Sequence, residues 1–138
     1  MERRTEAVVD ASVVVKWFSE EEGTGEAIRL RGEHVEGKRI LSAPDLLVYE
    51  ISNALRYKPN FDEDKVSRAV ADIIDLQIDL ITPGRDLVDK TTEVAYKYNA
   101  SMYDSFYLAL GELMGIEVYT ADKKFYNQAK KSGILRLI

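Results

Sequence analysis

Short aliphatic runs alternate with helical patterns along the whole chain, and this alternation constrains the fold more than any other feature. The runs carry mainly Val, Ile and Leu, as strands buried on both faces of a parallel sheet do. We predict strands over 7–10, 39–42, 79–82, 116–120 and 135–138. The helical patterns between them cover 12–19, 24–36, 45–57, 63–77, 85–98, 103–114 and 122–132. This order predicts an α/β fold whose central parallel β-sheet is flanked by helices on both faces.

The chain is predicted to be one domain, 1–138. Its 138 residues fit one domain better than two, and 46% hydrophobic residues suffice for a sizeable core. There is no internal repeat, low-complexity tract or linker. Gly115 and Gly133 stand just beyond two predicted helices, where glycine ends helices in the left-handed conformation.

Composition excludes several classes of protein. The sequence has no cysteine, so disulfide frameworks and thiolate metal sites are excluded, and a single histidine disfavours the usual zinc sites. The N-terminus MERRTEAVVD lacks the features of a signal peptide, and no window is apolar enough for a transmembrane helix. We therefore expect a soluble, cytoplasmic protein with no membrane partner. The net charge of −5 argues against broad coating of nucleic acid, although local basic contacts remain compatible with a nuclease.

Four acidic residues occupy positions where a carboxylate is awkward: Asp10, Glu50, Asp104 and Asp122. Asp10 and Asp122 follow predicted strands, and the carboxyl ends of parallel strands share one edge of the sheet. Two carboxylates about 4 Å apart repel each other by roughly 4 kcal/mol at an effective dielectric constant near 20. A converging cluster must therefore take up protons or bind a cation. Oxygen-only ligands point to Mg²⁺ or Mn²⁺.

Each acid also has a structural explanation. Asp10 and Asp122 could cap the helices that follow them, although Ser12 is placed to cap the first helix instead. Glu50 borders an apolar stripe and could reach water, and Asp104 stands in a first helical turn, where acids are favoured. The residues alone leave both interpretations open.

Other candidate features are weaker. His34 lies in a charged helix and is expected to be exposed. A basic patch near the C-terminus is either a nucleic-acid contact or a solvated helix face; it comprises Lys123, Lys124, Lys130, Lys131 and Arg136. Receiver domains and aspartate-nucleophile phosphohydrolases are disfavoured, because Ser12 stands where the latter need a second acid.

Taken together, VVDASVVVKWF, the helical Glu50, YDSFYLALG and TADKKFY resemble the PIN domain, and within it the VapC-like toxins of VapBC-type toxin–antitoxin pairs. The resemblance implies a Mg²⁺- or Mn²⁺-dependent endoribonuclease with Asp10, Glu50, Asp104 and Asp122 in its pocket. Ser12 and Thr120 match positions that often carry a hydroxyl beside it. It also implies an RNA substrate, a homodimer and a cognate antitoxin protein. PIN domains of RNA processing or decay, and a non-catalytic RNA-binding or assembly module, are the alternatives.

The predicted mechanism assigns a role to each residue. Asp10, Asp104 and Asp122 are metal ligands, direct or through water, and Glu50 ligates the metal or orients the attacking water. Phosphates of the RNA are contacted by Lys16, Lys123 and Lys124.

Overall fold

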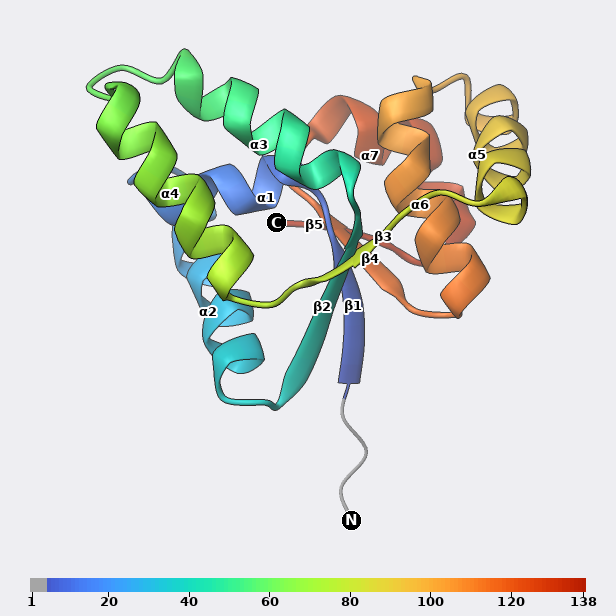
Figure 1. Cartoon of the computed structure of the whole chain (residues 1–138). Coiled ribbons are helices and arrows are strands. Elements are labelled where there is room, and N and C mark those ends of the chain that lie inside the picture. Colours follow the sequence, from blue (N-terminus) through green and yellow to red (C-terminus); the bar gives the residue numbers. More distant parts are fainter. Residues whose placement is uncertain (1–4) are drawn as a thin grey trace.

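Five parallel strands form the central sheet, in the order β3-β2-β1-β4-β5 (Figure 1). Their bounds are β1 (Thr5–Val9), β2 (Arg39–Pro44), β3 (Asp79–Ile81), β4 (Glu117–Thr120) and β5 (Leu135–Leu137). The structure is a computed structural model that describes residues 5–138; the first four residues of the predicted domain lie outside it. All five predicted strands are present, and the prediction of a parallel sheet is confirmed.

Helices fill the connections at the predicted places. They are α1 (Ala11–Val14), α2 (Thr24–Val35), α3 (Leu46–Arg56), α4 (Glu63–Asp75), α5 (Arg85–Tyr98), α6 (Met102–Met114) and α7 (Lys123–Ala129). Two predicted helices are broken: α1 passes into the 3₁₀ helix η1 (Val15–Phe18) and α7 into η2 (Lys130–Ser132). In the first, three consecutive valines at 13–15 weaken the α-helix because β-branched side chains lose rotamer freedom there.

The connections place helices on both faces of the sheet. From β1 the chain moves outward to β2 and β3, crosses back to β4 and continues to β5. Crossover connections between parallel strands are right-handed, so connections that run in opposite directions across the sheet place their helices on opposite faces. Accordingly α2 and α4 lie on one side of the sheet and α5, α6 and α7 on the other (Figure 1). The direction reverses between β1 and β4, and the carboxyl edge at such a switch point is where open α/β sheets bind ligands.

Helix α6 is the central helix of its layer and packs against β1, β2 and β4. Its residues from Tyr107 to Gly111 are all buried, so this part of α6 is enclosed on every side. A side chain at Gly111 would place its Cβ 2.2 Å from Val118 Cγ2 and 3.1 Å from the carbonyl oxygen of Ile116. Glycine at this position therefore allows α6 to approach β4 closely.

His34 contradicts its predicted exposure. The side chain is half-buried at the end of α2, where its Nε2 lies 2.7 Å from the carbonyl oxygen of Leu76 and its Nδ1 accepts a hydrogen bond from the Leu41 amide at 3.0 Å. Both partners come from distant segments, so the ring joins α2, β2 and the end of α4. The charged neighbours in the sequence gave no sign of these contacts.

Within the described residues, no helix has the length and apolar character needed to cross a bilayer.

Candidate active site

The four acids are gathered at the carboxyl edge of the sheet. Asp10 directly follows β1, Asp122 comes two residues after β4, Glu50 lies on the helix after β2, and Asp104 is in the first turn of α6. Their charges act on one another: those of Asp104 and Glu50 raise the pKa of Asp10, and that of Asp122 raises the pKa of Asp104. The structure therefore brings together residues separated by more than a hundred positions.

Asp10 is the most buried of the four, with 4% of its surface exposed. Its Oδ2 accepts a hydrogen bond from Thr120 Oγ1 at 2.8 Å, and its Oδ1 accepts one from the Ser12 amide at 3.3 Å. Burial raises the pKa of Asp10 to about 7, because it outweighs the two hydrogen bonds that favour the ionised form. Asp10 thus exchanges its proton near neutral pH.

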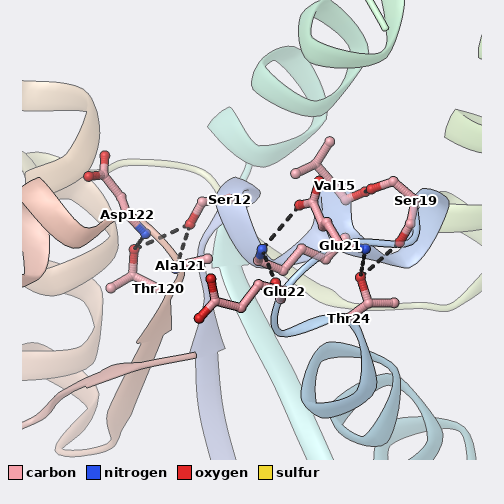
Figure 2. A network of polar contacts seen from close by, with 10 residues as sticks. Ser12, Val15, Ser19, Glu21, Glu22, Thr24, Thr120, Ala121 and Asp122 are labelled. Atoms are coloured by element: carbon pink, nitrogen blue, oxygen red, sulfur yellow. Dashed lines mark hydrogen bonds and ion pairs between the residues drawn. The ribbon is translucent and has the colours of Figure 1, made fainter. Parts of the chain in front are cut away.

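Ser12 and Thr120 join the turn after β1 to the turn after β4. Ser12 Oγ accepts a hydrogen bond from the Ala121 amide at 2.8 Å and lies 3.3 Å from Thr120 Oγ1, which also accepts one from the Asp122 amide at 3.1 Å (Figure 2). The expectation that Ser12 caps the first helix is wrong, since Asp10 is the N-cap of α1. Ser12 instead fixes the turn that carries Asp122.

Glu50 is half-buried and held by a residue that the sequence analysis did not select as a site residue. The hydroxyl of Tyr107 donates a 2.6 Å hydrogen bond to Glu50 Oε1. Burial raises the pKa of Glu50, this hydrogen bond lowers it, and the charge of Asp104 raises it. Tyr107 lies about one turn beyond Asp104 on α6, and its place in the motif YDSFYLALG was the available signal.

Asp104 and Asp122 occupy helix starts. Ser101 is the N-cap of α6 and accepts a 3.1 Å hydrogen bond from the Asp104 amide, so the Asp104 carboxylate is not needed as the cap. Burial raises the pKa of Asp104 most, with Asp122 adding to it and Lys124 opposing it. Asp122 does cap α7, because its Oδ1 accepts from the Phe125 amide at 3.1 Å. Its structural interpretation is therefore confirmed, while its part in the site stays a prediction.

The predicted phosphate-binding lysines differ in their surroundings. Lys16 is 13% exposed in its side chain and pairs with Glu21 Oε1 at 3.1 Å, while also donating to the carbonyl oxygen of Glu22. Figure 2 shows the Ser19, Glu21 and Thr24 contacts that order the same loop. Lys123 and Lys124, in contrast, are exposed at the start of α7. These two remain available to a ligand at the carboxyl edge.

The donor set suits a hydrated divalent cation. Among residues 5–138, no salt bridge involves Asp10, Glu50, Asp104 or Asp122, so this part of the chain supplies no direct ionic partner for their charge. Nor does any group of three or more acidic or histidine side chains in this part of the chain stand close enough to enclose a metal ion. Mg²⁺ keeps several waters and commonly takes only one or two carboxylates directly. An ion at this edge would therefore be held by one or two of these carboxylates, with water completing its coordination.

An apolar hollow of about 160 Å³ lies beside the acids, between the starts of α3 and α6. It is lined by Pro44, Asp45, Leu46, Tyr49, Pro83, Tyr103 and Phe106. Tyr49 and Tyr103 are 70% and 63% exposed and directly precede Glu50 and Asp104. We call these seven residues the apolar rim.

Comparisons with known proteins agree with this architecture. Residues 7–131 match the sequence model of the PIN domain family. A crystal structure of PAE2754 from Pyrobaculum aerophilum superposes with a TM-score of 0.70 at 21% identity, covering 95% of this chain and 83% of that one. VapC20 from Mycobacterium tuberculosis, described as a toxin that cleaves the sarcin–ricin loop, superposes with a TM-score of 0.70 at 18% identity, covering 93% and 95%. At these identities the likeness concerns the fold. A comparison with curated protein sequences gave no match.

Proposed function

This chain belongs to the PIN domain family, and from that membership and the site we infer that it is a metal-dependent endoribonuclease. The observation that carries the proposal is the gathering of four carboxylates at the carboxyl edge of the sheet. Asp10 among them is buried, and none of the four forms a salt bridge within residues 5–138. A fold keeps such a charge cluster at a cost in stability, which is expected where the cluster has a chemical task.

We further propose that the protein is the toxin of a toxin–antitoxin pair. The resemblance of its motifs to VapC-like toxins and the shared fold with VapC20 support this. RNA is then the substrate, a separate antitoxin protein is the partner that silences the enzyme, and the cytoplasm is the place of action. A homodimer is also part of the proposal.

The proposed reaction is hydrolysis of an RNA phosphodiester bond. Bound Mg²⁺ or Mn²⁺ would lower the pKa of a coordinated water and stabilise charge on the phosphate. Asp10, Asp104 and Asp122 would hold the ion, directly or through water. Glu50 would use Oε2 to orient the attacking water and accept its proton, since Oε1 is bonded to Tyr107.

The remaining polar groups would keep this arrangement in place. Thr120 holds one oxygen of Asp10 and receives the amide of Asp122, so it sets two of the carboxylates relative to each other. Exposed Lys123 and Lys124 would bind phosphates that flank the scissile bond.

The test is RNA cleavage by the purified protein with Mg²⁺ or Mn²⁺ and with a chelator. Asp104→Asn keeps the size of the side chain and removes its charge, so cleavage should fall by at least a hundredfold, the scale at which loss of one preorganised charge lowers a rate. Asp89→Asn is the matched control, because Asp89 pairs with Arg85 on the exposed surface of α5.

Cleavage that persists in chelator, or that Asp104→Asn retains in full, would contradict the proposal. RNA binding without any cleavage by the wild type would favour a non-catalytic RNA-binding module instead.

A further inference from the structure

Tyr107 is a buried residue whose hydroxyl contacts one of the four acids. Its side chain is completely buried, yet its hydroxyl ends at Glu50 Oε1, 2.6 Å away. That length belongs to the short class of hydrogen bonds between a hydroxyl and a carboxylate. A buried tyrosine hydroxyl needs a partner, so one explanation is that Glu50 merely satisfies Tyr107.

The conformational freedom of the two side chains indicates instead that Tyr107 positions Glu50. Glu50 is only half-buried and has three side-chain torsions, so without a partner its carboxylate would sample several positions, including water. Tyr107 has two torsions, and close packing inside the core fixes its ring. The rigid group therefore determines where the flexible group points.

The position of Tyr107 on its helix supports the same conclusion. Residues three apart on a helix share a face, so Tyr107 presents its hydroxyl on the side of α6 that carries Asp104. Helix α6 thereby contributes one acid itself and locates a second acid on α3. Among the described residues no group donates a hydrogen bond to Glu50 Oε2, which leaves that oxygen for the ion or its water.

We propose that Tyr107 is a positioning residue that orients Glu50 for the metal ion. The inference rests on the proposed metal site and goes beyond it by naming the group that preorganises one of its carboxylates. Partners that orient metal-binding side chains typically contribute ten- to a hundredfold to metal affinity. Tyr107 acts through Glu50 and touches neither the RNA nor the reacting atoms.

The experiment measures Mn²⁺ affinity without RNA, by calorimetry and by the rise in melting temperature with Mn²⁺ concentration. Tyr107→Phe should weaken Mn²⁺ binding about tenfold or more while leaving the far-ultraviolet circular dichroism unchanged, because only one oxygen is removed. Tyr119→Phe is the matched control. It deletes the hydroxyl of Tyr119, which lies 3.4 Å from the carboxylate of Glu117 on the same strand, β4. This variant should bind Mn²⁺ like the wild type.

A double-mutant cycle separates positioning from general loosening of the core. In a Glu50→Ala background there is no carboxylate to orient, so Tyr107→Phe should have no further effect on Mn²⁺ affinity. Equal losses in both backgrounds would overturn the proposal, as would wild-type affinity in Tyr107→Phe alone. A wild-type protein that does not bind Mn²⁺ at all would overturn the metal site itself, and with it this inference. The two failures are thus distinguishable.

Discussion

At the scale of single residues, Asp10 combines two requirements that conflict. As the N-cap of α1 it accepts an amide hydrogen bond, which favours the ionised carboxylate, whereas its burial beside Asp104 and Glu50 favours the protonated one. Burial prevails and raises the pKa of Asp10 to about 7. The metal-free protein therefore carries a carboxylate that folding makes harder to ionise.

A pH dependence of stability follows from Asp10. Its folded pKa of about 7 lies above the ordinary 3.8, so the native state binds the proton more tightly than the unfolded state does. The associated stability is fully present below pH 3.8 and is lost as the pH rises through 7, at up to about 1.4 kcal/mol per pH unit for one proton. Asp10→Asn, which remains a good N-cap, should therefore be more stable than the wild type at pH 8 in chelator.

Urea unfolding from pH 4 to pH 8 checks this expectation. The difference between Asp10→Asn and wild type should shrink as the pH falls and vanish near pH 4. Asp89→Asn, on the exposed surface of α5, should follow the wild type throughout. A constant difference at every pH would mean that Asp10 acts on stability through its contacts and not through its proton.

Mn²⁺ should stabilise the protein more at pH 8 than at pH 5.5, because the ion and the proton compete for Asp10. Binding to the native state raises its stability by RT ln(1 + [Mn²⁺]/Kd), so a tenfold weaker affinity lowers the gain by about 1.4 kcal/mol once the site is saturated. Melting temperatures measured across a Mn²⁺ titration should therefore rise more at pH 8 than at pH 5.5. A response independent of pH would contradict the proposed part of Asp10 in the site.

The sequence could predict the place of a residue in the fold where that place follows from the order of strands and helices along the chain. Asp10 and Asp122 were predicted to lie close together because each follows a strand, and strand ends of a parallel sheet share an edge. Tyr107 and His34 have functions in the fold that depend on hydrogen bonds to residues 57 and 42 positions away, respectively. No local pattern encodes such pairs, so Tyr107 was missed and His34 was misplaced.

At the scale of elements, α6 depends on Gly111 for its approach to β4. Gly111→Ala should destabilise the protein by about 1–3 kcal/mol, because the new methyl group would collide with Val118 and the backbone of residue 116. This loss exceeds the gain of about 0.5–1 kcal/mol that alanine gives in a helix. Gly32→Ala in α2 is the matched control and should be stabilising, since no atom lies within 4 Å of its added Cβ. Urea unfolding should show a lower free energy of unfolding for Gly111→Ala than for the wild type, and a higher one for Gly32→Ala.

Element positions were the most predictable part of the structure. Aliphatic runs and glycines after helices located all five strands and every helical segment, and Gly115 and Gly133 indeed end α6 and η2 with positive φ angles. The change from α to 3₁₀ geometry near residue 15 was not predicted, because the same valines that mark a buried helix face also weaken it. Hydrophobic periodicity reports burial and is less sensitive to helix type.

At the scale of the whole molecule, the apolar rim is the surface with which the proposed homodimer can be tested. Its two tyrosines, Tyr49 and Tyr103, line the same hollow and leave most of their surface exposed. Burial of a large apolar side chain contributes roughly 1.5–3 kcal/mol. A second copy of the chain that covered the apolar rim would bury Tyr49 and Tyr103 from both subunits and would bring two acidic pockets to one interface.

We therefore expect the wild type to sediment as a dimer and the double variant Tyr49→Ser/Tyr103→Ser to sediment as a monomer. Four rings are lost per dimer, so the dissociation constant should rise by several orders of magnitude at roughly 1.5–3 kcal/mol each. Tyr96→Ser provides the control, because Tyr96 is even more exposed, at 85%, but lies on α5 outside the apolar rim. The double variant should still bind Mn²⁺ like the wild type, which would show that it has lost association and that its acidic pocket is intact. A wild type that sediments as a monomer would contradict the proposed homodimer, and a double variant that stays dimeric would place its interface outside the apolar rim.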